Sequence, residues 1–384
     1  MFGDQVSSIA MPLAAVLVLK ASAAQMGYLT ALVWLPSLLF GVHAGAWVDR
    51  SGARRATMVA ADLGRCGLLA SLPIAYALGT LTLTHLYAVA FATGSLSALF
   101  NVADSTLFVA LVPADRYVEG NSLIYGSRAL SFVGGPSAGG VLVQWMTAPV
   151  AILVDAVSFL GSALLLRGIA ADEPPRARGR QGGLAAGIKF LTRTPTVRAC
   201  LCAAATINLF SFGFLALFVL YAVRELHVNP GLLGVVLGAG AVGGLLAAAA
   251  TRRLCHAIGL GWTSVLGCIL YTVPMALVPL AGGSKPLVLT MLFLSEFASG
   301  AGVMVLDISF GSIFASLIPD GLRARTTGAF QAVNFGTRPI GALAAGGAAT
   351  VIGLRPTLWL AVGGAALGFL WLLASPVPRL RAPA

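Results

Sequence analysis

The sequence predicts an all-α, polytopic membrane protein with twelve transmembrane helices, arranged as two parallel repeats of six helices each. Three observations support this fold class. Of the 384 residues, 58% are hydrophobic and only 10% are charged, whereas an ordinary soluble domain carries about 25% charged residues. Apolar stretches of bilayer length recur along the whole chain. Basic residues collect in alternate connectors between these stretches.

Six apolar stretches in the first half are long enough to cross a bilayer, which takes about 20 residues. They cover residues 2–19, 26–48, 57–78, 83–111, 123–145 and 149–166. Six more in the second half cover residues 197–223, 232–250, 263–280, 286–317, 327–352 and 357–373. We therefore expect a six-helix bundle over residues 1–166, a cytoplasmic linker over 167–196 and a second six-helix bundle over 197–384.

The first span begins at Phe2 without a polar leader, and Asp4 lies almost at the terminus. A twelve-helix protein normally carries a polar leader at this point. We therefore expect that the first helix is truncated at its N-terminus, either by a misplaced start codon or by shortening of the chain. A signal peptide would leave eleven spans and reverse the pattern of basic residues, so we reject it.

The interval between the two halves is too polar to cross a membrane, since it contains Asp172-Glu173-Pro174-Pro175-Arg176. Within it, Leu184, Ile188 and Leu191 have the spacing of the apolar stripe on a short interfacial helix. A plain linker helix is favoured over a regulatory one.

The basic residues of the connectors predict the orientation, because they concentrate on the cytoplasmic side of a membrane protein. With the N-terminus inside, 17 Lys and Arg residues fall in cytoplasmic segments and 4 in outer loops. We therefore expect both termini in the cytoplasm and the chain in the inner (plasma) membrane of a bacterium. The same asymmetry accounts for most of the net charge of +11, so no nucleic-acid partner is needed to explain it.

Metal, nucleotide and disulfide chemistry find no support in the sequence. The five cysteines lie in or beside apolar segments, without zinc spacing or a paired framework. No two of the four histidines have the spacing of metal ligands. The glycine-rich run over residues 238–244 lacks the lysine and hydroxyl of a phosphate loop. We expect no cofactor and no metal, and a membrane gradient rather than ATP as the energy source.

An internal repeat relates the two halves when they are aligned at Pro113 and Pro319. Leu111-Val112-Pro113 matches Leu317-Ile318-Pro319, each after a long span and before a basic connector. Parallel halves of this kind place a substrate site between them, near the bilayer midplane. Further residues that fall opposite each other are Asn101 and Asp307, Gly135 and Gly341, and Gly140 and Gly346.

The fifth predicted span contains Gly135-Pro136-Ser137-Ala138-Gly139-Gly140. A proline removes a backbone donor and disturbs a helix, and in hydrocarbon the freed carbonyl must be satisfied by neighbouring helices or water. The flanking glycines let another helix approach closely or let this helix bend. The cluster is typical of a membrane helix that packs tightly and changes shape.

The connector after the second span reads Gly45-Ala46-Trp47-Val48-Asp49-Arg50-Ser51-Gly52-Ala53-Arg54-Arg55, which has the spacing GxxxDRxGxRR. Glycine permits a tight turn, and Asp49 can accept hydrogen bonds from arginines or from a helix N-terminus. Taken alone, the stretch could be a solvated basic loop. After the second of twelve helices, however, the pattern is specific.

With these motifs the chain resembles a transporter of the major facilitator superfamily. The connector matches that superfamily's signature between helices two and three. Gly135-Pro136-x-x-Gly139-Gly140 resembles the helix-five signature of its antiporters, although Ser131 stands where that pattern has its first glycine. The chain also resembles the enterobactin-exporter-like and macrolide-efflux-like branch through three stretches, which are Phe2-Gly3-Asp4-Gln5-Val6, Asp62 with Arg65, and Ile352-Gly353-Leu354-Arg355-Pro356-Thr357-Leu358-Trp359.

The resemblance implies a cytoplasmic gate at the connector motif. Asp49 would bond to the neighbouring half in the outward-facing state, and loss of this bond would shift the access equilibrium by about 1–2 kcal/mol. The alternative is that the arginines only hold the connector inside. The second-half counterpart at Thr251-Arg252-Arg253-Leu254 has no aspartate. The residues assigned to the gate motif are Gly45, Asp49, Arg50, Gly52, Arg54 and Arg55.

Carboxylates inside spans are candidates for proton coupling, because a charge in hydrocarbon is costly and usually faces a water-filled pathway. The candidates are Asp4, Glu296 and Asp307. Asp4 could instead be a permanently ionised interfacial group, and Glu296 could have a hydrogen-bonded packing role. Asp307 is the weaker candidate, since its repeat counterpart Asn101 cannot carry a proton.

The remaining intramembrane charges favour structural roles. Asp62 and Arg65 lie three residues apart and can neutralise each other on one helix face. Asp155 lies two turns inside its span and could line an outer vestibule, although a structural role is slightly favoured. Arg128 and Arg338 are expected to snorkel to the interface rather than bind an anionic substrate.

The sequence thus predicts a proton-coupled exporter of small amphipathic or apolar molecules, such as antibiotics or siderophores. Its expected partners are a small-molecule substrate, protons and the lipid bilayer, and it is expected to act as a monomer. Uptake by symport or uniport is the alternative. A non-transporting receptor or a membrane enzyme is disfavoured, because the charges are dispersed rather than clustered as a nucleophile, base or metal set.

Overall fold

The computed structural model describes residues 1–51, 54–111, 117–168 and 184–381, and within these ranges the chain is helical almost throughout and contains no β-strand. Helices are the expected form, because a spanning segment in lipid must satisfy its backbone hydrogen bonds internally. The helical elements of the first half are α1 (Phe2–Leu13), η1 (Ala14–Val18), α2 (Ala23–Ser51), α3 (Arg54–Ala77), α4 (Leu83–Leu111), α5 (Tyr117–Met146) and α6 (Ala148–Arg167).

The second half begins with a short helix, α7, followed by long apolar helices. The elements are α7 (Leu184–Arg193), α8 (Pro195–Arg224), α9 (Pro230–Ile258), α10 (Leu260–Thr272), η3 (Pro274–Ala276), α11 (Leu277–Leu280), α12 (Lys285–Leu317), α13 (Asp320–Ile352), α14 (Leu354–Ala366), α15 (Gly368–Leu373) and η4 (Val377–Arg379).

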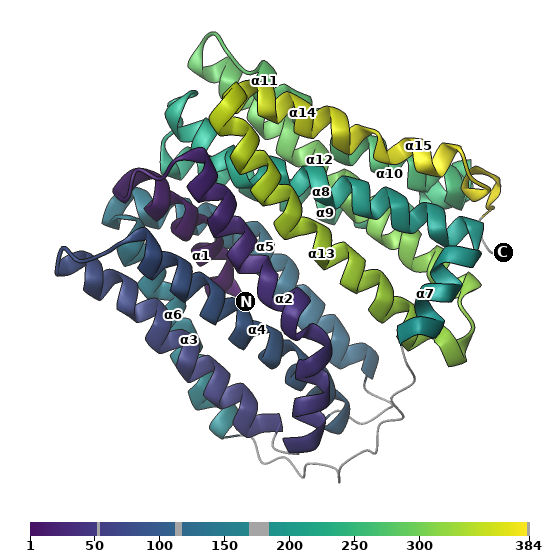
Figure 1. Cartoon of the computed structure of the whole chain (residues 1–384), viewed down its shortest axis with the longest axis horizontal. Coiled ribbons are helices and arrows are strands. Elements are labelled where there is room, and N and C mark those ends of the chain that lie inside the picture. Colours follow the sequence, from purple (N-terminus) through teal and green to yellow (C-terminus); the bar gives the residue numbers. More distant parts are fainter. Residues whose placement is uncertain (52–53, 112–116, 169–183, 382–384) are drawn as a thin grey trace. The chain divides into compact units, whose positions relative to one another are not determined.

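The chain divides into two compact units, each a bundle of helices (Figure 1). The first unit holds α1 to α6 together with Asn229–Gly234, at the start of α9. Within it, α1 packs on α5 and α6, α2 packs on α4, and α3 packs on α4 and α6. The second unit holds α7, α8, the rest of α9 and the elements that follow. In that unit α8 packs on α13 and α14, and α10 packs on α12.

Nine helical stretches in the described part of the chain are long and apolar enough to cross a membrane. They coincide with nine of the twelve predicted spans. The other three predicted spans are also helical: the first is a shorter apolar helix, Phe2–Val18, and the fifth and eleventh lie in α5 and α13. The all-α membrane fold is therefore confirmed, whereas the number of crossings stays a prediction.

Prolines lie inside several of these helices without ending them. The α5 helix runs without interruption from Tyr117 to Met146 through Pro136, so the glycine–proline cluster does not break it. Pro12 lies near the end of α1, and the next turns widen into the π-helix η1. There the amide of Leu19 donates to the carbonyl of Ala14 at 3.1 Å. Pro12 has no backbone N–H to donate within the helix, and the hydrogen-bond pattern changes from α-helical to π-helical just after it.

The same kind of close helix contact recurs in both units. In the first unit, Gly139 of α5 lies so near α1 that an added Cβ atom would come 3.0 Å from the Val6 Cα atom. In the second unit, Gly341 of α13 lies directly against the backbone carbonyl of Leu209 on α8. Small residues allow helix backbones to approach this closely. Because α5 and α13 are the helices that the internal repeat aligns, the repeat extends from the sequence to the packing.

The linker helix α7 packs on α13 and α8 of the second unit. Leu191 is only 1% exposed and shares a small apolar core with Val197 and Ala329. Ile188, by contrast, is 52% exposed. The predicted apolar stripe is therefore divided, with Leu191 facing the protein and Ile188 facing outward.

Candidate functional site

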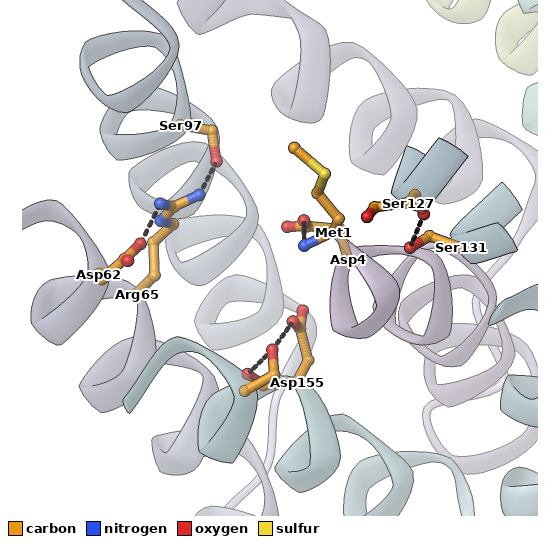
Figure 2. Close-up of polar contacts among 9 residues, drawn as sticks. Met1, Asp4, Asp62, Arg65, Ser97, Ser127, Ser131 and Asp155 are labelled. Atoms are coloured by element: carbon orange, nitrogen blue, oxygen red, sulfur yellow. Dashed lines mark hydrogen bonds and ion pairs between the residues drawn. The ribbon is translucent and has the colours of Figure 1, made fainter. Parts of the chain in front are cut away.

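Charged side chains from three separate helices gather inside the first unit (Figure 2). We call Asp4 of α1, Asp62 and Arg65 of α3, and Asp155 of α6 the charge cluster. Asp4 interacts electrostatically with each of the other three residues. The sequence indicated only the Asp62–Arg65 pair, because nothing in it shows that α1 and α6 pack against each other.

Asp62 and Arg65 form a buried ion pair between Oδ1 and Nη2, with 0% and 4% of the two residues exposed. This pairing one turn apart on α3 is what their spacing predicts. In the described part of the chain, the Asp62 Oδ2 and Arg65 Nε atoms have no hydrogen-bond partner. The pair is therefore neutralised but not fully satisfied.

Two neighbouring helices fix the guanidinium group of Arg65. Its Nη1 atom donates to the Ser97 hydroxyl on α4 at 3.2 Å (Figure 2). The guanidinium carbon lies 4.5 Å from the ring centre of Phe100 on α4 and 4.1 Å from that of Phe159 on α6. Such cation–π contacts are strongest where water is excluded. Arg65 therefore ties α3 to both α4 and α6.

Asp155 is the most isolated carboxylate of the charge cluster. It is 2% exposed, and its Oδ1 atom accepts a hydrogen bond from the Ser158 hydroxyl at 3.2 Å. In the described ranges it has no salt-bridge partner. The carboxylate is covered by protein, which supports the structural role over the outer vestibule that the sequence left as an alternative.

The backbone of α1 lies directly against this carboxylate. A Cβ atom added to Gly3 would overlap both the Asp155 Oδ1 atom and the Ser158 hydroxyl, and would come 2.9 Å from the Asp155 Cα atom. Only glycine leaves room for this approach. The side chain of the adjacent Asp4 is 43% exposed, and its Oδ2 atom lies 2.8 Å from the amino group of Met1. In the charge cluster, the Asp4 carboxylate is thus partly exposed, whereas the Asp155 carboxylate is buried.

In the second unit, Glu296 of α12 lies against α9 at Gly240. A Cβ atom on Gly240 would come 3.2 Å from the Glu296 carbonyl oxygen and 3.6 Å from its Oε2 atom. Glu296 is half-buried, and the described residues offer its carboxylate no hydrogen bond or ion pair. Ser299, one turn further, is buried, and its hydroxyl has no partner in the described chain. These features leave Glu296 able to bind a ligand or a proton.

Arg338 of α13 makes the same kinds of contact in the second unit as Arg65 makes in the first, although the two arginines lie on helices that the internal repeat does not align. Its Nε atom donates to the Asn208 Oδ1 atom on α8 at 3.1 Å. Its guanidinium carbon lies 4.5 Å from the ring centre of Phe212 and 4.7 Å from that of Phe335. The exposed Asp307 of α12 interacts with it electrostatically.

The expectation that Arg338 snorkels to the interface is therefore wrong. Arg338 lies midway along α13, and its guanidinium group is engaged by Asn208, Phe212 and Phe335 instead of extending along the helix. The Asn208 amide is itself oriented, because its Nδ2 atom donates to the Ala204 carbonyl at 2.9 Å. Asn208 and Ser97 are functional candidates that the sequence did not single out, since polar residues on apolar helices carry no periodic signal.

The helix-five motif lies against α1 and against the start of α9, all within the first unit. A Cβ atom on Gly135 would overlap Gln5 and come 3.3 Å from the Phe2 carbonyl oxygen. One on Gly140 would come 2.7 Å from the Gly234 Cα atom. The glycines therefore serve close packing on two faces of a continuous helix, rather than a bend.

Gln144 of α5 extends this contact by one turn. Its Oε1 atom accepts a hydrogen bond from the Gly231 amide at 3.0 Å. That amide lies in the first turn of α9, where backbone donors have no partner within the helix. Gln144 is a further residue that the sequence did not single out.

The connector motif is only partly described. Gly45, Asp49 and Arg50 lie within α2, but the structure does not describe their side chains, and Gly52 lies outside the described residues. Arg54 and Arg55 begin α3 and are half-buried. The gate role of Asp49 stays a prediction. No group of three or more His, Cys, Asp or Glu residues that could hold a metal ion occurs in the described ranges.

Comparisons with known proteins agree over most of the chain. A profile of the family described as "Major Facilitator Superfamily" matches residues 1–335. The "Multidrug efflux pump Tap" of Mycolicibacterium fortuitum is 26% identical in an alignment 364 residues long, gaps included, that covers 90% of this chain and 85% of that protein. The protein of the same name from Mycobacterium tuberculosis (strain ATCC 25618 / H37Rv) is 26% identical over 402 residues, covering 99% of this chain and 91% of that protein.

Solved structures show the same fold. A bacterial homologue of the iron transporter ferroportin, in an inward-facing state, aligns with a TM-score of 0.76 at 16% identity, covering 97% of this chain and 95% of that one. The nucleoside transporter NupG aligns with a TM-score of 0.76 at 12% identity, covering 97% of this chain and 98% of that one. At these identities the likeness concerns the fold alone.

Proposed function

This chain belongs to the Major Facilitator Superfamily, and we propose that it exports small amphipathic or apolar molecules, such as drugs or siderophores, in exchange for protons. The observation that carries the proposal is the similarity to multidrug efflux pumps over nearly the full length of both chains. Transport would proceed by alternating access, with the substrate site near the bilayer midplane between two parallel six-helix bundles.

Proton coupling is assigned to Asp4, Glu296 and Asp307. Support comes from their environment: Asp4 is partly exposed within a cluster of buried charges, and Glu296 has no hydrogen-bond or ion-pair partner among the described residues. A carboxylate within a membrane helix is costly unless a pathway or a ligand compensates it. These groups would take up protons from one side and release them on the other as the bundles rock.

The packing of the helix-five motif also supports antiport. Gly135, Gly139 and Gly140 bring α5 into close contact with α1 and the first turn of α9. Such tight packing would seal the bundle on one side, so that protons and substrate cannot leak past each other. Asp49, supported by Arg50, Arg54 and Arg55, would close the cytoplasmic side in the outward-facing state.

The cellular setting follows from the same proposal. The described part of the chain contains nine apolar helices of spanning length, so this is a multi-pass membrane protein. We place it in the plasma membrane of a bacterium as a monomer, with both termini in the cytoplasm, because its basic residues favour that orientation.

Transport by everted membrane vesicles tests the proposed function. Vesicles energised with a proton gradient should accumulate ethidium only when the intact protein is present, and collapse of the gradient should abolish the accumulation. The double variant Asp4→Asn/Glu296→Gln should lose this response, whereas the control variant Asp104→Asn, which changes another carboxylate of the first unit, should keep it.

The outcomes separate the alternatives. Accumulation that persists in the double variant would remove the coupling assignment while leaving export intact. Transport that ignores the gradient would favour a uniport facilitator, and proton-driven movement out of everted vesicles would favour an uptake symporter. Absence of any movement of ethidium or of other amphipathic dyes would favour a receptor or an enzyme of the same fold.

A further inference from the structure

The buried carboxylate of Asp155 has no salt-bridge partner among the described residues of the first unit, whereas Asp62 pairs with Arg65. The Asp155 side chain is buried, and the Ser158 hydroxyl donates a hydrogen bond to its Oδ1 atom at 3.2 Å. The one arginine of the charge cluster, Arg65, is bonded to Asp62 and held between two phenyl rings. A buried ionised carboxylate without a cationic partner is costly.

The charged groups around Asp155 come from two helices. From α1 the Asp4 carboxylate and the Met1 amino group act on it electrostatically. From α3 Arg65 does so, already paired with Asp62. The α5 helix, which also packs on α6, carries no charged residue between Arg128 and Met146. Asp155 therefore has a second carboxylate, Asp4, among the charged groups near it.

A second buried hydroxyl group, that of Ser7, supports a proton-binding site at Asp155. The Ser7 hydroxyl of α1 lies beside Asp155, on a residue that is only 7% exposed. It makes no well-formed hydrogen bond with any described residue. A hydroxyl can donate to an ionised carboxylate or accept from a protonated one. Ser7 and Ser158 can thus support both states of Asp155.

We propose that Asp155 is a proton-binding site of the first unit, and that the proton reaches it by way of the partly exposed Asp4. The partly exposed Asp4 meets water, and the covered Asp155 holds the proton away from it. One proton enters on Asp4 and passes to Asp155, which leaves Asp4 ionised again, so only O–H bonds form and break. A negative charge on Asp4 makes a second charge on the buried Asp155 more costly, which favours a bound proton there.

A proton bound to Asp155 would act on the packing of α1 against its neighbouring helices. Asp155 lies against α1 at Gly3, and α1 also packs on Gly135 and Gly139 of α5. Protonation would remove a buried charge from the contact between α1 and α6 and so favour a different packing of α1. The inference rests on the proposed function, because it names a residue through which the proton of that exchange would pass.

Chemical labelling of the unaltered full chain provides the first test. Dicyclohexylcarbodiimide reacts with protonated carboxyl groups in apolar surroundings, and mass spectrometry locates the product. In detergent or liposomes we expect modification of Asp155 that decreases as the pH rises, because the reagent needs the protonated carboxyl group. Absence of the product from the peptide that contains Asp155 at every pH, while Glu296 is modified, would overturn the inference.

A comparison of two transport assays provides the second test. In proteoliposomes, gradient-driven ethidium accumulation requires proton coupling, whereas ethidium exchange at equal concentration and equal pH on both sides does not. The Asp155→Asn variant should lose accumulation at least about tenfold and keep exchange within about twofold. Asp104→Asn should keep both, and Asp155→Glu should recover part of the accumulation because it restores a carboxyl group.

The outcomes distinguish this inference from the proposed function. If the unaltered protein accumulates ethidium and Asp155→Asn does so equally well, the inference falls and proton-coupled export stands. If the unaltered protein shows no response to the gradient, both fall. Loss of exchange as well as accumulation in both Asp155→Asn and Asp155→Glu would assign the residue a purely structural role, which also overturns the inference.

Discussion

Gly3 of α1 and Asp155 of α6 are in direct contact, and the absence of a side chain at Gly3 is what makes the contact possible. A Cβ atom at this position would overlap the Asp155 Oδ1 atom and the Ser158 hydroxyl. The contact brings the two ends of the first half of the sequence together. It also covers the one carboxylate of the charge cluster that has no cationic partner among the described residues.

Gly3→Ala should therefore impair both stability and transport. We expect a loss of about 1–3 kcal/mol in the free energy of unfolding, because overpacking forces the carboxylate or α1 to move. Thermal unfolding in detergent and ethidium transport in vesicles measure the two effects. Gly67→Ala on α3 is the matched control, since a Cβ atom there would meet nothing within 4 Å. Equal behaviour of the two variants would contradict the close contact.

The Asp62–Arg65 pair should show strong coupling in a double-mutant cycle. Arg65→Gln alone leaves a buried carboxylate without its partner, and we expect it to cost about 3–5 kcal/mol. Asp62→Asn/Arg65→Gln should cost less than the sum of the two single changes, because neither charge is then left alone. Thermal unfolding of the four proteins gives the coupling energy. A coupling energy near zero would mean that the pair adds nothing to stability.

Close packing of α13 on α8 should depend on Gly341. Gly341→Ala would drive a methyl group into the Leu209 carbonyl, and we expect a loss of about 1–3 kcal/mol together with reduced transport. On the same helix, a Cβ atom at Gly347 would meet nothing within 4 Å. Gly347→Ala should therefore be neutral or slightly stabilising, as replacement of a helical glycine usually is. If Gly341→Ala were equally harmless in unfolding and transport assays, the repeated glycine contact would have no energetic role.

Replacement of Arg338 by lysine separates the two interpretations of this residue. A residue that merely snorkels accepts lysine, whereas the present site also uses a planar guanidinium between Phe212 and Phe335. We expect Arg338→Lys to lower transport about tenfold, with the protein still inserted in the membrane. Asn208→Ala should lower it less, by about threefold, since it removes the hydrogen bond to Arg338 Nε but leaves the guanidinium group and its ring contacts in place. Wild-type transport by Arg338→Lys would restore the snorkelling interpretation.

The sequence by itself determined the class of the protein. Its apolar stretches and sparse charges predict membrane helices, because a chain in hydrocarbon has few other ways to satisfy its backbone. The spacing of Asp62 and Arg65 on one helix was also enough to predict their pairing, since residues one turn apart share a helix face. Motifs at Gly45 and Gly135 were enough to indicate the family.

Tertiary structure alone decided which charges meet. Hydropathy shows that a segment spans the membrane, but not which neighbour it packs against, so the contact of Gly3 with Asp155 and the contacts of Arg338 with two phenyl rings could not be predicted from it. Both contacts depend on glycines and polar residues of helices that lie far apart in the sequence. The shapes of the helix surfaces decide how these helices fit together. Local periodicity acts over a few turns of one helix, whereas a site inside a bundle is made from segments that come together only on folding.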